Sequence, residues 1–550
     1  MKKVIKYLKD NHFKKSIALI FFSILSGFIE IVNIGMLIPI LSVFLEVSSF
    51  DDNSNIIFKF VENYLMKVSL TNLILIFLFV NIFKIIFLIF INIYKSSFVN
   101  NISNLNSLTL LKRYAKANLF EEKKININLL MRNIIIENKN FTHNVITPFI
   151  EIISEIFVII IISSFILFVS IKEFALIITI FTFFIAIFYL TLRKINYTLG
   201  SGSLSLEGIR INLVKNILNS TRELYIFKKL SDYINLYKIK NREYFNIQKL
   251  IIVIQNLPRI WIEFVLVLTI TIILFFFIEV ESSYDMLIIK LSLFIFVSIK
   301  LIPSFTKLLS SSQLLRVSKP VIDLITPELV FKKPLKEKKI KIFKKLEVRN
   351  LKFKYLSNEK YIINNLSFNI NKFDKIAFIG KSGSGKSTLV NLIIGFLKPK
   401  SGKIIINNKY EDFNMDCSYV PQEVFIFDET ILRNICLNFN NEKINFVKLK
   451  KIVKILNLER FINEVMKGFD TKLSNSGDGL SVGQKQRIGI ARALYKESKI
   501  YIFDEFTSSL DLSTEKEIIN SLKIFLKSKT VIIITHRKYP LKICNKTIRL

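Results

Sequence analysis

The chain opens with a series of long apolar runs that are separated by polar segments and end near residue 315. Each run has about 19 to 30 residues, which lets a helix rising about 1.5 Å per residue cross a hydrocarbon core of about 30 Å. The runs that we expect to span a membrane are 16–45, 70–94, 145–170, 174–192, 249–278 and 285–309. Six spans place both ends of this region on the same side of the membrane.

The polar segments between the spans differ in charge, and that difference predicts their side. The two long segments, 95–144 and 193–248, are rich in Lys and Arg. The short connectors carry acids, namely Asp51, Asp52, Glu279, Glu281 and Asp285. Because basic segments tend to stay on the cytoplasmic side, both long segments and both termini are expected there. We expect the long segments to continue as helices below the bilayer.

Beyond a Lys-rich linker at 326–343, short β-type runs alternate with helical ones, as in an α/β nucleotide-binding domain. The predicted fold is therefore an all-α transmembrane domain (1–325), followed by an α/β domain (344–550) of the phosphate-binding-loop class. A mean hydropathy of +0.42 agrees with a membrane protein. The net charge of +35 suits an anionic membrane surface, and nucleic acid is not expected as a partner. Three cysteines without a CxxC pair make a disulfide framework or zinc site improbable.

The clearest motif is a Gly/Ser-rich loop after the apolar run Ile376–Ile379 and before the apolar-periodic stretch Thr388–Leu397. This is the strand, loop and helix setting of a phosphate-binding loop. Its glycines let successive N–H groups surround a phosphate at the positive end of the new helix. The loop residues expected to bind ATP are Gly380, Ser382, Gly383, Ser384, Gly385, Lys386, Ser387 and Thr388. Lys386 is suited to the β- and γ-phosphates, and the Ser387 hydroxyl to Mg²⁺.

Further polar residues follow at strand ends and helix starts. Gln422 comes after a strand, where its amide can reach Mg²⁺ or the attacking water. A buried strand ends in Asp504, suited to Mg²⁺, and Glu505, suited to polarise the attacking water as general base. His536 ends another strand and is expected to contact the γ-phosphate, although such a histidine alone is more often structural. The series predicts a Mg²⁺-dependent ATPase.

A second helix start, Leu480–Gln484, offers Ser481, Gly483 and Gln484 to phosphate, and Asp511 lies shortly after the two carboxylates. With these residues in order, the chain resembles an ABC exporter half-transporter over essentially its whole length. The resemblance implies a homodimer with ATP between the loop at 380–388 of one subunit and residues 481–484 of the other. It also implies that Tyr355 stacks on adenine, where the alternative is an ordinary strand tyrosine.

The resemblance extends to two stretches, Leu129–Asn133 and Arg222–Phe227, which are similar to the coupling helices of the family. The sequence departs from the family at Val482, which stands where glycine is usual. A valine adds bulk and disfavours a positive φ, so we expect a weaker ATP sandwich. Residues 473–477 also lack the usual Gly-Glu pair, which puts coupling efficiency in doubt.

Three cations lie inside predicted spans, where charges are costly and face a cavity or a partner. Lys84, Arg259 and Lys300 come from the second, fifth and sixth spans. Together they suit an anionic headgroup. The segment Pro258-Arg259-Ile260 with Glu263, and the segment Ile302-Pro303-Ser304 after Lys300, resemble the lipid-linked oligosaccharide flippases of bacterial protein glycosylation. Alternatively each cation reaches an interface or pairs with an acid, the nearby acids being Glu30, Glu151, Glu155 and Glu263.

This second resemblance implies an ATP-driven flippase in the bacterial inner membrane that moves a polyprenyl-pyrophosphate oligosaccharide to the outer leaflet. It also implies that Ser49–Lys67 is a short external helix for the lipid tail, where the alternative is a plain loop. Lipid A, peptides or amphipathic drugs are alternative substrates. An ATP-regulated channel is the alternative from another class, and the presence of Glu505 argues against it.

Overall fold

The computed structural model describes residues 2–44, 68–120, 126–169, 171–280, 284–330, 338–340, 343–355, 360–381, 383–407, 413–438, 443–474 and 479–550. The chain separates into two compact units. Unit 1 comprises residues 1–115 and 125–332, and unit 2 comprises residues 116–124 and 333–550. The predicted linker at 326–343 includes the end of helix α12 (Lys319–Leu329) and strand β1 (Lys338–Ile340).

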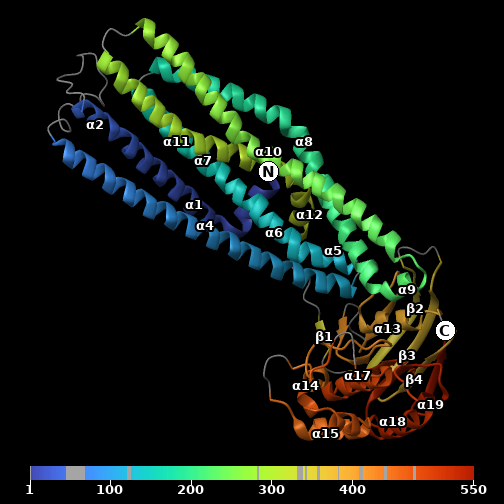
Figure 1. Cartoon of the computed structure of the whole chain (residues 1–550). Helices are drawn as coiled ribbons and strands as arrows, with labels where there is room; N and C mark the ends of the chain where they lie inside the picture. Colours follow the sequence, from blue (N-terminus) through green and yellow to red (C-terminus); the bar gives the residue numbers. More distant parts are fainter. Residues whose placement is uncertain are drawn as a thin grey trace. The chain divides into compact units, whose positions relative to one another are not determined.

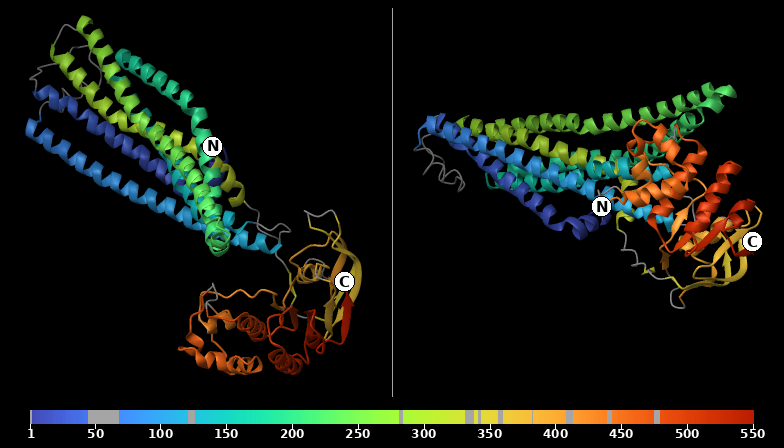
Figure 2. Two further views of the ribbon diagram at one scale, coloured as in Figure 1. Left: turned by 45° about the vertical axis from the view of Figure 1, so that its right-hand side comes forward. Right: turned by 90° about the horizontal axis from the view of Figure 1, so that it is seen from below.

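Unit 1 is a bundle of long helices that run alongside one another in both sets of views (Figures 1 and 2). Its long elements are α1 (Lys2–Gly35) with its continuation α2 (Leu37–Phe44), α4 (Leu70–Phe120), α7 (Thr147–Val169), α8 (Ile171–Asn219), α10 (Leu230–Val280) and α11 (Tyr284–Val317). Their large apolar side chains are often exposed within the unit, as a lipid-facing surface requires. Phe79 on α4 is 69% exposed and Leu190 on α8 is 64% exposed.

Four helical segments of the described residues are long and apolar enough to cross a membrane: His12–Phe44, Leu70–Lys116, Ile127–Phe165 and Leu230–Ile272. The spans expected at 174–192 and 285–309 lie on α8 and α11, whose side chains are described only in part. The external helix expected within Ser49–Lys67 lies outside the described residues.

Shorter helical elements join the long ones. α5 (Ile127–Arg132), α6 (Asn138–Phe141) and two π-helical turns, η2 (Asn133–Glu137) and η3 (Thr142–Ile146), lead without a break into α7. The stretch Leu129–Asn133, expected as a coupling helix, lies on α5 and the start of η2. The other such stretch, Arg222–Phe227, coincides with α9 (Thr221–Ile226), where Tyr225, Ile226 and Phe227 are all more than 70% exposed.

Unit 2 is built on a five-stranded parallel sheet in the described residues, with strand order β10-β4-β9-β8-β7. Its strands are β4 (Lys375–Ile379), β7 (Ser418–Val420), β8 (Ile500–Asp504), β9 (Thr530–Ile534) and β10 (Lys546–Arg549). A three-stranded antiparallel sheet adds β2 (Lys345–Phe353), β3 (Ile363–Asn371) and β5 (Ser401–Ile406), and β1 pairs with β6 (Phe413–Met415).

Unit 2 also has helices α13 (Lys386–Ile394), α14 (Ile431–Cys436), α15 (Phe446–Ile455), α16 (Glu459–Glu464), α17 (Val482–Lys496), α18 (Leu512–Phe525) and α19 (Lys538–Leu541), and the turn η4 (Gly468–Asp470).

The central strands are apolar on both faces because both faces are covered. In β8, Ile500 and Ile502 pack into one core, while Tyr501 and Phe503 pack into the other. All five residues of β8 and of β9 are buried. Since parallel strands covered on both faces read as continuous apolar runs, the uninterrupted patterns at 500–503 and 531–534 have a direct physical cause.

Candidate functional site

The Gly/Ser-rich loop lies between the end of β4 and the start of α13, as its sequence predicts. Gly383 (φ +81°) and Gly385 (φ +90°) adopt left-handed backbone conformations that L side chains avoid. The Lys386 side chain is buried, and its Nζ donates to the carbonyl oxygens of Gly380 (3.0 Å) and Lys381 (2.8 Å). Ser382 lies outside the described residues.

Two observations show that this loop fits a phosphate group. Ser384 Oγ is buried without a hydrogen-bond partner among the described residues, so a polar donor is held ready there. A Cβ on Gly380 would lie 2.6 Å from the Leu550 carbonyl oxygen and 2.8 Å from Ser384 Oγ, so only glycine fits. Together with the first N–H groups of α13, which an α-helix leaves without intrahelical acceptors, these groups form a donor set for phosphate oxygens.

Tyr355 is the predicted adenine-stacking residue, and it lies near the loop. Its hydroxyl is 3.1 Å from Oγ1 of Thr388, the second residue after Lys386 in α13, and its ring packs edge-on against Phe353. Tyr355 is only partly buried. The structure therefore places the tyrosine beside the phosphate loop with part of its ring accessible.

Asp504 is the last residue of β8 and Glu505 follows it, at the edge of the sheet where the loop also lies. Asp504 is buried, and burial raises the pKa of its carboxyl, while a hydrogen bond with Ser387 opposes that rise. The Ser387 hydroxyl and Asp504 carboxylate therefore form an oxygen pair of the kind that Mg²⁺ prefers. A Mg²⁺ ion bound here would also compensate the negative charge of the Asp504 carboxylate, which burial disfavours.

Glu505 is brought together with the two other predicted catalytic residues. Gln422 Nε2 donates to Glu505 Oε2 at 2.9 Å, and His536 Nε2 lies 3.6 Å from Glu505 Oε1. The three residues follow β7, β8 and β9, which are neighbours in the parallel sheet. Since the carboxyl ends of parallel strands meet at one edge, the topology explains how residues about 30 to 110 positions apart converge.

The second predicted phosphate-binding segment caps helix α17. Ser481 Oγ accepts from Gln484 N (3.1 Å) while Gln484 Oε1 accepts from Ser481 N (2.7 Å), which makes a complete capping box. Val482 opens the helix without a positive φ, so the backbone penalty expected for valine does not arise, and its side chain is 62% exposed. A Cβ on Gly483 would lie 3.2 Å from the Ser509 carbonyl oxygen, which favours glycine there.

Asp511 caps the next helix. Its Oδ2 accepts from Ser513 Oγ and, at 2.9 Å, from Thr514 N at the start of α18, and these bonds hold the pKa of its carboxyl far below the usual range. Residues 475–478, within and just after the stretch where the Gly-Glu pair is missing, lie outside the described residues. Asp511 thus caps α18 with an exposed, ionised carboxylate, and its expected place at the ATP site stays a prediction.

Two residues that the sequence did not single out hold this region together. The buried Gln486 donates from Nε2 to Ser508 Oγ (2.8 Å) and accepts from Ser509 N (3.0 Å). Arg537 donates to the carbonyl oxygens of Ser508 (2.7 Å) and Leu510 (2.8 Å). Arg537 directly follows His536, so this arginine ties the histidine's strand end to the 508–510 segment.

The sequence offered only a weak signal for these two residues. Gln486 is a glutamine on the apolar side of a predicted helix, and Arg537 is an arginine directly after the predicted histidine.

Each of the three cations predicted to meet a substrate contacts an acid. Lys84 and Lys300 both contact Glu30, Lys84 more closely and Lys300 at 3.6 Å, so α1, α4 and α11 meet at one carboxylate. Beside them, the amides of Asn33 and Asn81 exchange two 2.9 Å hydrogen bonds. Arg259 instead pairs with Glu263 on its own helix at 3.0 Å and is 77% exposed.

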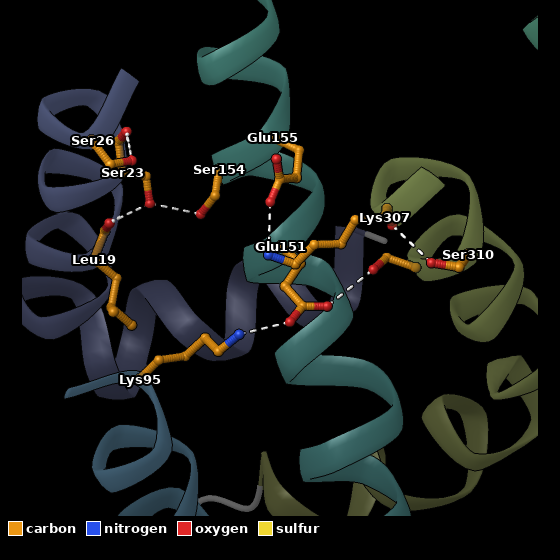
Figure 3. Close-up of polar contacts among 10 residues, drawn as sticks. Leu19, Ser23, Ser26, Lys95, Glu151, Ser154, Glu155, Lys307 and Ser310 are labelled. Atoms are coloured by element: carbon orange, nitrogen blue, oxygen red, sulfur yellow. Dashed lines mark hydrogen bonds and ion pairs between the residues drawn. The ribbon is translucent and has the colours of Figure 1, made fainter. Parts of the chain in front are cut away.

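Further acids in the bundle are also paired, as Figure 3 shows. Glu151 on α7 accepts from Lys95 Nζ at 2.7 Å and from Ser311 Oγ at 3.1 Å. One turn further along the same helix, Glu155 accepts from Lys307 at 2.7 Å. The structure therefore gathers ionic groups along α7, while Lys84 and Lys300 contact one acid and Arg259 contacts another.

Comparison with known proteins agrees with this architecture. Residues 363–508 match the family model described as ABC transporter. The chain is 40% identical over 199 residues to a Rickettsia typhi protein named as a candidate export ATP-binding/permease protein, and 36% identical over 198 residues to the ATP-dependent lipid A-core flippase of Haemophilus influenzae. Both alignments cover 35% of this chain and 34% of the relative, so they span about a third of the relatives' length.

A solved structure extends the likeness to the rest of the chain. A bacterial Atm1-family ABC exporter with ATP bound aligns with a TM-score of 0.79 over 98% of this chain and 93% of that chain, at 18% identity. The predicted fold class is thus confirmed. The chain has the fold of an ABC exporter, a helical transmembrane domain followed by an ATPase domain of the ABC transporter type that binds ATP, normally with Mg²⁺.

Proposed function

We propose that this protein is an ATP-driven exporter that works as a homodimer in the bacterial inner membrane, with its ATPase domain in the cytoplasm. The observation that carries the proposal is the convergence of Gln422, Glu505 and His536 at the sheet edge beside the phosphate loop. The exporter fold supplies the transmembrane domain on which such an ATPase acts.

The contacts of each residue at that edge of the sheet suggest its part in ATP hydrolysis. Lys386 and Ser384 bind phosphate oxygens, and Ser387, Gln422 and Asp504 hold Mg²⁺, which when bound neutralises charge that develops on the transferred phosphoryl group. Glu505 takes the proton of the attacking water as general base. Gln422 orients that carboxylate through its 2.9 Å hydrogen bond, and His536 contacts the γ-phosphate. In the homodimer, Ser481, Gly483 and Gln484 complete the site of the other subunit.

The transported molecule that we propose is a lipid-linked oligosaccharide carried on a polyprenyl pyrophosphate. Lys84 and Lys300 share Glu30, so among the described residues one positive charge of this cluster stays uncompensated, whereas Arg259 is balanced by Glu263. One such charge from each subunit suits a phosphate-bearing lipid, because an uncompensated charge within a span is costly unless it meets a counter-charge. The lipid A flippases among the relatives make lipid A the second candidate.

The test is ATP-dependent flipping of a fluorescent polyprenyl-pyrophosphate glycan in proteoliposomes, with the Glu505→Gln protein as control. We expect flipping that requires ATP and is lost in the control. Flipping of lipid A in the same vesicles, without flipping of the glycan, would replace the first substrate by the second. If the protein hydrolyses ATP but transports none of the candidate lipids, peptides or drugs, the exporter proposal is overturned.

A further inference from the structure

A cavity of about 710 Å³, lined mainly by residues with polar side chains, lies in the transmembrane unit between α7, α10 and α11. We call it the head cavity, and its volume is within the range of about 300–1,000 Å³ that small-molecule sites occupy. Its polar lining from α10 and α11 consists of Gln255, Asn256, Arg259, Glu263, Thr306, Ser310 and Ser311. Glu151 contributes from α7. Most of the residues that line this cavity carry polar groups, so it can hold the polar part of a ligand.

The charges around the head cavity are already balanced. Arg259 and Glu263 pair with each other, and Glu151 is held by Lys95 and Ser311 (Figure 3). The groups left to recognise a ligand are therefore the amides of Gln255 and Asn256 and hydroxyls such as Thr306, whose Oγ1 is buried without a hydrogen-bond partner among the described residues. Amides, hydroxyls and carboxylate lone pairs together match neighbouring hydroxyl groups of a sugar, which both donate and accept.

A second cavity, of about 680 Å³, lies between α8 and α10, and we call it the tail cavity. Its lining is almost wholly apolar and includes Ile187, Phe188, Leu192, Leu257, Trp261 and Phe264. The polar atom of Trp261 is already used, because its indole N–H donates to the Phe184 carbonyl oxygen at 3.2 Å. This cavity therefore suits hydrocarbon.

The two cavities adjoin. Ile260 lines both, and on either side of it α10 presents a polar and an apolar face. Asn256, Arg259 and Glu263 recur at spacings of three and four residues toward the head cavity, while Leu257, Trp261 and Phe264 do so toward the tail cavity. A single molecule with a polar and an apolar part can occupy both at once, and it would lie across Ile260.

We propose that α10 carries a two-part site for a sugar-headed amphiphile, with the sugar in the head cavity and the hydrocarbon chain of the same molecule in the tail cavity. This inference rests on the proposed function and specifies where the substrate is recognised. A polyprenyl-pyrophosphate glycan and lipid A share this chemistry.

The experiment measures binding of each fluorescent lipid to the full chain in nanodiscs without ATP. Asn256→Leu alters the head cavity, with Asn246→Leu as the matched control, since Asn246 is an exposed asparagine on the same helix outside both cavities. Thr191→Trp fills the tail cavity, with Thr198→Trp as its control on α8. Size-exclusion profiles and circular-dichroism melting curves that match those of the parental protein establish that the variants fold.

We expect Asn256→Leu and Thr191→Trp each to weaken binding of the recognised lipid about tenfold, and both controls to leave it unchanged. The free glycan pyrophosphate should compete with that lipid on the parental and Thr191→Trp proteins but less well on Asn256→Leu. Polyprenol should show the opposite pattern. The lipid that binds in this way, the polyprenyl glycan or lipid A, identifies the source of the sugar head.

Equal affinities for Asn256→Leu and Asn246→Leu would overturn the head assignment, and polyprenol competition that is indifferent to Thr191→Trp would overturn the tail assignment. Flipping in proteoliposomes separates this inference from the proposed function. Binding with the expected pattern but without ATP-dependent flipping removes the proposed function and leaves the site. Flipping that Asn256→Leu does not change removes the site and leaves the exporter.

Discussion

At the scale of single residues, Glu505 is held in an unusual backbone conformation. Its φ of +46° lies in the left-handed region, which costs a non-glycine residue about 1 kcal/mol or more. Two contacts stabilise it: its N–H donates to the Ile534 carbonyl oxygen at 3.0 Å, and its carboxylate accepts from Gln422. The carboxylate is therefore positioned by both its backbone and a neighbouring strand end.

A first prediction concerns this positioning. Gln422→Leu removes the hydrogen bond to Glu505 while keeping similar volume, so we expect kcat for ATP hydrolysis to fall about tenfold or more. Nucleotide affinity measured in EDTA, where the proposed contact of Gln422 with Mg²⁺ plays no part, should change little. Steady-state ATPase assays and nucleotide titrations measure the two quantities. Glu423→Gln, at the exposed neighbouring position, should behave as the parental protein. An unchanged kcat in Gln422→Leu would contradict the positioning role.

A second prediction concerns Asp504, whose pKa is raised by burial. A carboxyl with a raised folded-state pKa favours the folded state only while protonated, so the metal-free fold loses stability as pH rises through that pKa. We therefore expect Asp504→Asn to raise the melting temperature at neutral pH in EDTA and to abolish Mg²⁺-dependent ATP hydrolysis. The gain should shrink as pH is lowered, and calorimetry with and without Mg²⁺ measures it. A lower melting temperature for Asp504→Asn in EDTA would contradict the cost of the buried charge.

Most residues of the ATP site could be predicted because their chemistry is local in sequence: a loop between a strand and a helix, or a carboxylate at a strand end. Gln486 and Arg537 could not. Their partners, at 508–510, lie more than 20 residues away, and only the packing of α17 and β9 against that segment brings them into reach. Pattern alone gives an arginine after a strand no particular role.

At the scale of elements, Arg537 joins the end of β9 to α18 as well as to the 508–510 segment. Its guanidinium lies 3.2 Å from the Glu515 carboxylate, which is fully buried. A third prediction follows: Arg537→Ala leaves that charge without its partner and should destabilise the ATPase domain by about 3 kcal/mol. Denaturant unfolding of the full chain in detergent, followed by circular dichroism, measures the change.

The control for this prediction removes both charges. Arg537→Met combined with Glu515→Leu should recover much of the lost stability, because no buried charge is left unpaired. If the double variant is as unstable as Arg537→Ala, the hydrogen bonds from Arg537 to Ser508 and Leu510 carry the effect and the ion pair does not.

Three membrane helices depend on a single acid in the same way. Glu30 on α1 is 12% exposed and faces Lys84 on α4 and Lys300 on α11. A fourth prediction is that Glu30→Gln, which leaves two neighbouring lysines uncompensated, lowers the melting temperature in detergent and the yield of folded protein. Adding Lys300→Met should restore part of the loss. Glu263→Gln, in the exposed pair with Arg259, should have little effect.

The pairing of these charges could not be predicted from the sequence. The spans and their cations could be located from apolar runs, and Glu30 could be named as a possible partner. Which acid meets which cation depends on how helices 54 and 270 residues apart pack, and no local pattern encodes that. The same holds for the cavities beside α10, because their walls come from four different helices.

At the scale of the whole molecule, one chain carries a single phosphate loop and a single Ser481 helix start. In the proposed homodimer each ATP site takes one part from each subunit. A fifth prediction uses this: Lys386→Ala and Ser481→Arg proteins should each lack ATPase activity alone, but co-expression should restore about a quarter of the parental rate, since half of the dimers then hold one intact site.

The matched control is co-expression of Lys386→Ala with Lys386→Met, in which every dimer retains two defective loops. This pair should stay inactive. Recovery that is absent in the Lys386→Ala and Ser481→Arg mixture, despite affinity-tag evidence that mixed dimers form, would show that each chain builds its ATP site alone.

The two π-helical turns ahead of α7 change the direction in which the side chains of α7 point. Each residue of an α-helix turns the chain by about 100°, and a π turn accommodates one extra residue. Together η2 and η3 thus rotate everything that follows by about 200° relative to an uninterrupted helix. Removing one residue from each π-helical turn would leave a regular α-helix of almost the same composition. Glu151 and Glu155 would then point away from Lys95 and Lys307. The length of this segment, more than its composition, is what sets the direction of its carboxylates.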